Sequence, residues 1–369
     1  MKIALITIHN ANNYGAILQT FALQKVLSRY GDVEIIDYDN KHISIDFDLI
    51  RIKPSFHGLL GMGKDIFRLL PRYRVLKNFK QFIAKNMNLT KKMSAQELQL
   101  SHVGNFDVYV AGSDQIWNPA CISENCFIDP IYFLNFVPKG AKKISYASSM
   151  GSYQWSMEEK CHIKELLKDF DTISVREKDG QILLQEILER PVHHVVDPTL
   201  LLSKNEWLEV LGGNSERKEK EKYILLYSVP KTELIRSAIK YFSKKLGLKV
   251  IAIDQGLSTI GKVDKQIRDA GPIEYLNLFA NAEFIITDSF HGTCFSVNFQ
   301  KPFVAIAPGK HSNRIESLLS LIGLEDRIVR GEEEFANLNI EIDFEEPSKN
   351  LLKIRGESLS ILSNTLQGY

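Results

Sequence analysis

The sequence predicts an α/β protein made of two domains, each with a Rossmann-like parallel sheet, facing each other across a cleft. Short apolar runs alternate with helical patterns along the chain. The alternation is interrupted once, by a glycine, serine and charge cluster near residues 212–222. With 369 residues, the chain is long enough for two cores. We expect domains at 1–212 and 223–345, a linker at 213–222 and a C-terminal helix at 346–369.

The expected elements follow from the spacing of apolar residues. In the first half, strands are predicted at 2–8, 33–38, 106–111, 143–147, 172–175 and 193–196, and helices at 16–30, 157–170 and 177–188. In the second half, strands are predicted at 223–229, 249–254, 284–287 and 303–307, and helices at 233–246, 273–281 and 351–362. Two such domains around a cleft have the layout of GT-B glycosyltransferases, by analogy of layout alone.

Composition narrows the function classes. The formal net charge of +1 argues against general nucleic-acid binding. No apolar run reaches the roughly 18 residues of a transmembrane helix, and the first eight residues are too short for a signal peptide. The four cysteines show no paired metal spacing, so neither a metal site nor a disulfide is predicted. The expected compartment is the cytoplasm.

One segment is strongly basic. Residues 51–92 contain eleven Lys or Arg and a single acid, Asp65, interleaved with apolar residues. Such a segment can lie on an anionic membrane surface or bind a phosphorylated substrate, or it can be an ordinary amphipathic helix pair with a basic solvated face. A peripheral contact with the inner membrane face is therefore an open expectation.

The corner after the strand at 284–287 is the most informative part of the chain. The apolar run stops at a polar cluster formed by Asp288, Ser289, His291, Gly292 and Thr293. Parallel sheets bind ligands at the carboxyl ends of their strands, where the next helix offers free N–H groups to an anion. His291 is thus a candidate for holding a phosphate or moving a proton.

Other corners carry further candidates. The loop before the first helix offers Asn13, Tyr14 and Gly15, although a capped βα loop explains these residues as well. The segment 112–119 offers Ser113, Asp114 as a general base, Gln115, and Trp117 as a platform for a sugar ring. Ser148 lies in a hydroxyl-rich turn that suits close approach of a ligand or of backbone.

Two positions could bind anions. Arg176 follows the strand at 172–175 and could clamp a phosphate or carboxylate, or simply pair with Glu177. Asn313 and Arg314 open a predicted helix and are a further possible anion contact, whereas Asp197 is predicted to belong to a structural turn.

Two motifs are rejected. Residues 58–64 spell GxxxxGK, but Asp65 replaces the Ser or Thr of a P-loop and would repel phosphate. His193 and His194 are adjacent in a predicted strand, so their side chains point to opposite faces and cannot bind one metal ion.

Taken together and in order, these corners resemble the polysaccharide pyruvyl transferase family. The matching pieces lie at 13–19, 112–118, 145–148, 174–177, 197–199, 289–293 and 313–314. The resemblance implies a GT-B-like fold, no organic cofactor, and transfer of the enolpyruvyl group of phosphoenolpyruvate onto two hydroxyls of a saccharide acceptor in cell-surface polysaccharide synthesis. The acceptor could be lipid-linked.

We hypothesise that His291 binds phosphate and donates a proton, that Arg176 binds the carboxylate or phosphate of the donor, and that Asp114 deprotonates the sugar. The chain departs from the family pattern at Ser289, where family members carry an arginine two places before the motif histidine; Lys310, Arg314 or another cation would have to replace that charge. The alternatives are a GT-B glycosyltransferase that uses a nucleotide sugar and a non-catalytic carbohydrate-binding family member.

Overall fold

The computed structural model describes residues 1–49, 69–100, 103–212, 221–307 and 313–367. The chain forms two compact units. The first comprises Met1–Phe47, Ile83–Leu201 and Leu352–Tyr369, and the second comprises Asp48–Phe82 and Leu202–Leu351. Along the chain, one of the divisions between the units falls between Leu201 and Leu202; the linker was expected at 213–222, of which 213–220 lies outside the described residues. Composition can indicate a loop, but it cannot show against which hydrophobic core a helix later in the chain packs.

The first unit contains a parallel sheet in the order β2-β1-β3-β4. Two short strands, β5 and β6, pair in parallel and adjoin β4 through the bridges Ile144–Thr172 and Ser148–Val175. The strands are β1 (Lys2–Ile6), β2 (Asp32–Ile35), β3 (Val108–Ala111), β4 (Lys142–Ser145), β5 (Ser174–Val175) and β6 (His193–His194). The order reverses between β1 and β3, as in the doubly wound flavodoxin-like arrangement.

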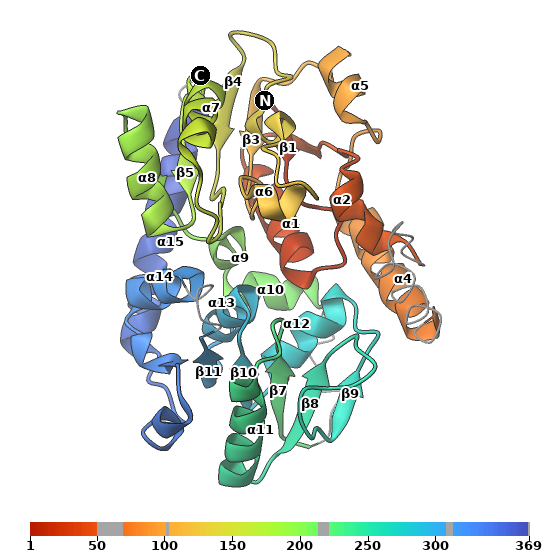
Figure 1. Ribbon diagram of the computed structural model, residues 1–369, viewed down its shortest axis with the longest axis vertical. Helices are drawn as coiled ribbons and strands as arrows, with labels where there is room; N and C mark the ends of the chain where they lie inside the picture. Colours follow the sequence, from red (N-terminus) through yellow and green to blue (C-terminus); the bar gives the residue numbers. More distant parts are fainter. Residues whose placement is uncertain (50–68, 101–102, 213–220, 308–312, 368–369) are drawn as a thin grey trace. The chain divides into compact units, whose positions relative to one another are not determined.

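Helices cover this sheet (Figure 1). They are α1 (Tyr14–Leu27), α2 (Lys41–Ser44), α5 (Ala95–Leu100), α6 (Pro119–Ile122), α7 (Met157–Leu167), α8 (Lys178–Leu188) and α9 (Pro198–Leu201). On one face, Ala4 and Ile6 of β1 share a core with Ile163 of α7 and Leu184 of α8. All four residues of β3 are buried, as expected for a central parallel strand covered on both faces.

The second unit contains a six-stranded parallel sheet in the order β12-β11-β10-β7-β8-β9. The strands are β7 (Tyr223–Tyr227), β8 (Lys249–Ile253), β9 (Lys265–Ile267), β10 (Phe284–Thr287), β11 (Phe303–Ile306) and β12 (Ile328–Val329). Counted from β7 as the first strand, this is the Rossmann order 3-2-1-4-5-6, and it reverses between β7 and β10. The short strands β9 and β12 were not predicted, because runs of three and two residues show no usable periodicity.

The second sheet is covered on both faces (Figure 1). Its helices are α10 (Lys204–Val210), α11 (Glu233–Leu246), α12 (Pro272–Asn281), α13 (Phe290–Asn298) and α14 (Asn313–Ile322). Ile224 and Ile286 share a core with Phe242 of α11. On the opposite face, Tyr227 packs edge-on against Tyr275 of α12, with ring centroids 5.1 Å apart.

Two longer helices, α4 (Leu69–Asn86) and α15 (Glu345–Gln367), each contribute residues to both units. The boundary in α4 falls between Phe82 and Ile83, and the boundary in α15 falls between Leu351 and Leu352. In the described part of the chain, no helix is long and apolar enough to cross a membrane.

Candidate functional site

Each sheet, taken by itself, places polar side chains at the carboxyl ends of the two strands where its order reverses. In the first unit, Thr7 follows β1, and Ser113 and Asp114 follow β3. In the second unit, Ser228 follows β7 and Asp288 follows β10. Open α/β sheets bind ligands at such reversals, because the flanking loops diverge there and leave room. Each unit therefore carries one candidate site.

In the second unit, the predicted residues of the 288–293 cluster gather at the start of α13. Ser289 is the N-cap, and its side chain accepts a hydrogen bond of 3.3 Å from Gly292 N. The hydroxyl of Thr293 donates back to Ser289 O at 3.1 Å. His291 lies in the first helical turn with only 8% of its surface exposed. The structure thus places these residues at the start of a helix that follows a buried strand, and their part in a functional site stays a prediction.

Gly292 allows α13 to lie close to β10. A Cβ atom at this position would be 2.3 Å from Thr287 Oγ1, far inside van der Waals contact. The Thr287 hydroxyl itself donates a 2.7 Å hydrogen bond to Tyr227 O on β7. Gly292 thus positions the start of the helix, and with it His291, against the two strands at the reversal.

Asp288 ties the loops after β10 and β7 together. Its carboxylate accepts hydrogen bonds from Ser228 Oγ at 2.6 Å and from Val229 N at 2.7 Å. Burial raises the pKa of Asp288 above its ordinary value, although these hydrogen bonds oppose the shift. Ser228 was not among the predicted site residues, because the predicted strand at 223–229 included it, whereas β7 ends at Tyr227.

Arg314 lies near the same helix start. Its guanidinium lies 5.7 Å from the centre of the Phe290 ring, and the Phe290 ring meets the His291 ring edge-on at 5.2 Å. Asn313, the first residue of α14, is exposed. Lys310, the other cation considered for this corner, lies outside the described residues.

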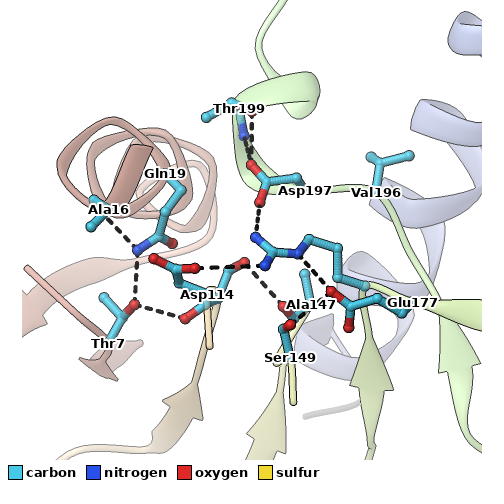
Figure 2. A network of polar contacts seen from close by, with 12 residues as sticks. Thr7, Ala16, Gln19, Asp114, Ala147, Ser149, Glu177, Val196, Asp197 and Thr199 are labelled. Atoms are coloured by element: carbon cyan, nitrogen blue, oxygen red, sulfur yellow. Dashed lines mark hydrogen bonds and ion pairs between the residues drawn. The ribbon is translucent and has the colours of Figure 1, made fainter. Parts of the chain in front are cut away.

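In the first unit, Arg176 is the centre of a buried ionic network (Figure 2). Its Nη1 donates to Asp197 Oδ2 at 2.7 Å and its Nε to Glu177 Oε1 at 3.1 Å. Its Nη2 lies 3.6 Å from Asp114 Oδ1. Ser149 Oγ also donates to Glu177 Oε1, at 2.7 Å. The network therefore sets three carboxylates against one guanidinium.

The charge of Arg176 is balanced by the carboxylates around it. Burial disfavours its charge, but Glu177, Asp197 and Asp114 outweigh that effect and raise the pKa of Arg176 above its ordinary value. An incoming phosphate or carboxylate would have to compete with three resident carboxylates. The guanidinium of Arg176 is thus already paired within the protein, and its predicted role as an anion clamp stays a prediction.

Asp114 occupies a constrained corner. Its φ of 69° lies in the left-handed region, which few residues other than glycine, asparagine and aspartate adopt. The neighbouring loops are held by hydroxyl groups: Ser113 Oγ donates to Ala147 O and Ser148 Oγ to Ala111 O, both at 3.0 Å. The candidates Ser113 and Ser148 thus fasten the backbone, and both are fully buried.

Thr7 and Gln19 complete this corner and were not predicted as site residues. Thr7 Oγ1 donates to Ser113 O at 2.9 Å and accepts from Gln19 Nε2 at 2.9 Å (Figure 2). Glu177 and Asp197 were predicted only as a surface partner of Arg176 and as a turn residue. A polar residue inside a buried element, such as Gln19 within the apolar face of α1, was the signal for this network.

Trp117 belongs to the core. It is 1% exposed, its ring stacks on Phe133 with centroids 5.2 Å apart, and its Nε1 donates to Tyr132 O. A ring this buried has no face to offer a sugar, so the predicted stacking role has no structural basis. Gln115 is half-buried and accepts a 2.8 Å hydrogen bond from Asn118 Nδ2.

The loop before α1 has the geometry of a capped βα turn. Asn13 is the N-cap, and its side chain accepts a hydrogen bond of 3.2 Å from Ala16 N. Tyr14 and Gly15 are buried in the first turn of α1. Of the three predicted residues, only Asn13 is exposed.

Comparisons with known proteins agree with this geometry. The fold resembles that of a UDP-GlcNAc 2-epimerase from Neisseria meningitidis bound to UDP-GlcNAc, with 13% identity, full coverage of both chains and a TM-score of 0.53. A second UDP-N-acetylglucosamine 2-epimerase matches with 10% identity, 98% coverage of this chain, 95% of the other and a TM-score of 0.50. These likenesses confirm the GT-B-like pair of Rossmann-like domains. A search of curated proteins found no match.

The family comparison is more specific than the likeness of folds. The model of the family described as polysaccharide pyruvyl transferase matches residues 13–310, which include every predicted site residue except Asn313 and Arg314. The seven sequence pieces that suggested this family lie almost wholly within that range. This chain belongs to the polysaccharide pyruvyl transferase family.

Proposed function

We propose that this protein transfers the enolpyruvyl group of phosphoenolpyruvate to two hydroxyls of one sugar, forming a pyruvate ketal and releasing phosphate, in the synthesis of a cell-surface polysaccharide. Family membership supports a transferase of this class. The observation that carries the donor assignment is the position of His291, in the first turn of α13 at the order reversal of the second sheet.

The start of α13 suits a phosphate. The first N–H groups of a helix have no intrahelical partner and the helix dipole favours negative charge, so an anion is stabilised there. Charge-assisted hydrogen bonds contribute about 1.5–3 kcal/mol each. Ser289 uses its side chain as the N-cap, and we assign the cationic contribution to Arg314, whose guanidinium lies over the neighbouring Phe290 ring.

The proposed chemistry needs one acid and one base. A proton from His291 adds to the CH2 carbon of the donor, and the first sugar hydroxyl forms a bond to C2. The second hydroxyl then forms another bond to C2 as the C2–O bond to phosphate breaks. Of the two hydroxyl protons, one is taken by the base, which then gives it up so that His291 regains the proton it donated, and the other leaves with phosphate. The reaction as written requires no organic cofactor.

On the acceptor side, we assign the base to Asp114. Its position is supported by Arg176, which Asp197 and Glu177 hold from the other side. The guanidinium lies 3.6 Å from Asp114 Oδ1 and so fixes the place of this carboxylate at the end of β3.

Titration of phosphoenolpyruvate into the purified protein, followed by calorimetry, tests the donor assignment. We expect saturable binding that His291→Ala weakens at least tenfold and that Arg314→Gln weakens as well. The matched controls are His162→Ala and Arg236→Gln, which change exposed residues of α7 and α11. Binding that survives His291→Ala unchanged would remove His291 from the donor site.

The same titration separates the alternatives. If the protein bound UDP tightly and phosphoenolpyruvate not at all, with or without a saccharide, nucleotide-sugar glycosyl transfer would replace pyruvyl transfer. If it bound a saccharide but neither donor, it would be a non-catalytic carbohydrate-binding member of the family. Phosphate release from phosphoenolpyruvate with an acceptor present supports the enzyme.

We further propose that the acceptor is lipid-linked and that α4 contacts the inner membrane face. The helix carries no acid between Leu69 and Asn86. Lys77, Lys80 and Lys85 are exposed along it, and Leu70 and Tyr73 expose 60% and 54% of their surface near its start. Residues 51–68 of the predicted basic segment lie outside the described residues.

Vesicle sedimentation tests this contact. Replacing Lys77, Lys80 and Lys85 by glutamate should release the protein from vesicles rich in anionic lipid. A matched variant with glutamate at Lys240, Lys244 and Lys353, which are exposed elsewhere, has the same net charge and should remain bound. Equal partition of both variants would show that net charge alone acts, and that α4 has no special role.

A further inference from the structure

The corner after β9 contains a cation, Arg268, for which the described part of the chain provides no counter-charge. Arg268 directly follows β9, and its Nε and Nη2 atoms are buried without a hydrogen-bond partner. No hydrogen bond or ion pair of the Arg268 side chain occurs among the described residues. Leaving a buried charged donor unsatisfied is costly, so such a group requires an explanation.

The carboxylates closest to Arg268 along the strands and the chain are bound to other cations. Asp254, which follows β8, accepts two hydrogen bonds from Lys231 Nζ, at 2.8 and 2.7 Å, and one from Gly256 N at 2.7 Å. Asp269, the next residue in the chain, lies 3.4 Å from Arg74 Nη1. The corner thus holds two cations, Lys231 and Arg268, and its nearest carboxylate is already saturated by one of them.

These groups lie at one edge of the sheet. Ile253 pairs with Ile267 in the parallel register of β8 and β9, so Asp254 and Arg268 follow at the same end of adjacent strands. Thr232, next to Lys231, also has a buried Oγ1 without a hydrogen bond, and it makes no side-chain cap to α11. A second donor is therefore unsatisfied in the residues that flank this corner.

We propose that Arg268 binds a phosphate or diphosphate group at the carboxyl ends of β8 and β9. A guanidinium can bind two phosphate oxygens side by side, and the pairing of Asp254 with Lys231 keeps the nearest carboxylate from neutralising Arg268. In the sheet order, β9 is three strands from β10, roughly 14 Å at about 4.8 Å per strand. This subsite is therefore separate from the start of α13, and it does not depend on the donor proposed there.

The energetics give the proposal a distinctive signature. The two buried, unsatisfied nitrogens of the partly buried Arg268 destabilise the ligand-free protein, so an apolar residue of similar length in its place should not lower stability. A ligand that neutralises the cation should raise the melting temperature of the wild-type protein, since it binds only the folded state. Arg268→Met should therefore keep or raise the Tm without ligand and lose the ligand-induced rise.

The experiment is best done in a His291→Ala background, which removes the proposed donor site. Pyrophosphate and UDP are titrated by calorimetry and by thermal melting, with Arg268→Met added to that background. We expect at least tenfold weaker binding of both probes than in His291→Ala alone. Arg236→Met is the matched control, because Arg236 is an exposed arginine of α11 paired with Glu233, and it should bind as its parent does.

The results with the two probes either identify the ligand or overturn the proposal. Preference for UDP over pyrophosphate would identify the ligand as a nucleoside diphosphate, and equal binding would identify a phosphate group carried by another molecule such as a saccharide. Failure of both probes to bind at millimolar concentration, unchanged binding by Arg268→Met, or a fall in its ligand-free Tm would overturn the proposal. If phosphoenolpyruvate fails to bind the wild-type protein, the proposed function fails while this test stands.

Discussion

The guanidinium of Arg176 and the carboxylate of Asp197 form a fully buried ion pair, with Nη1 and Oδ2 2.7 Å apart. Asp197 also accepts hydrogen bonds from Thr199 N at 2.9 Å and from Thr199 Oγ1 at 2.7 Å. The pair joins the loop after β5 to the start of α9. The other two nitrogens of the guanidinium, Nη2 and Nε, face Asp114 and Glu177. The stability of this network should therefore depend on the balance between its one positive and three negative charges.

Arg176→Met should destabilise the first unit far more than Glu177→Gln. Removing the arginine leaves three buried carboxylates without a cation, and breaking a buried pair in this way costs about 3–5 kcal/mol. Glu177→Gln lowers the excess of negative charge and keeps an acceptor for Ser149 Oγ, so a change within about 1 kcal/mol is expected. Urea unfolding measures both; equal losses would show that charge balance is not what stabilises the network.

Gly292→Ala should destabilise the protein by about 1–3 kcal/mol, because the new Cβ would lie 2.3 Å from Thr287 Oγ1. Gly356→Ala is the control: it lies in α15 with no atom within 4 Å of the added carbon, and should stabilise by about 0.5–1 kcal/mol. In a Thr287→Ala background the cost of Gly292→Ala should shrink, a coupling that a double-mutant cycle measures. If the destabilisations of the two substitutions simply add, the strain caused by Gly292→Ala does not come from its contact with Thr287.

Stability should fall as the pH drops below about 6.5, partly because of His194. Burial lowers the pKa of His194. The hydrogen bond that its Nε2 donates to Arg176 O at 3.0 Å opposes this shift and is outweighed by burial. Because the folded-state pKa lies below the unfolded value, this contribution is complete above about pH 6.5 and is lost as the pH falls through the folded-state pKa. His194→Gln should reduce the slope of unfolding free energy against pH in this range, and an unchanged slope would contradict the role given to His194.

Asp114→Asn should lower kcat for phosphate release by about 10²–10⁴ and leave phosphoenolpyruvate affinity unchanged, because a general base acts in the chemical step. Asparagine suits the positive φ at this position, so folding should be preserved. Asp169→Asn, an exposed carboxylate near α7, is the control. A variant with normal kcat would require another base.

The sequence predicted the corner at α13 well because its residues are local. Strand, N-cap, histidine and glycine follow one another within six positions, so their spacing alone brings them together at the start of a helix. It failed for Trp117 because burial is not a local property: the same indole that could stack on a sugar packs against Phe133, whose position depends on the tertiary structure.

By itself, the sequence determined the alternation of strands and helices, the family, and the polar corners that end the strands, since these depend on periodicity and short-range chemistry. Only the tertiary structure decided the strand orders that place Thr7 beside Ser113 and Ser228 beside Asp288. It likewise decided that Arg176 faces three carboxylates while Arg268 faces none among the described residues. Which charges meet depends on the pairing of distant strands, which no local pattern encodes.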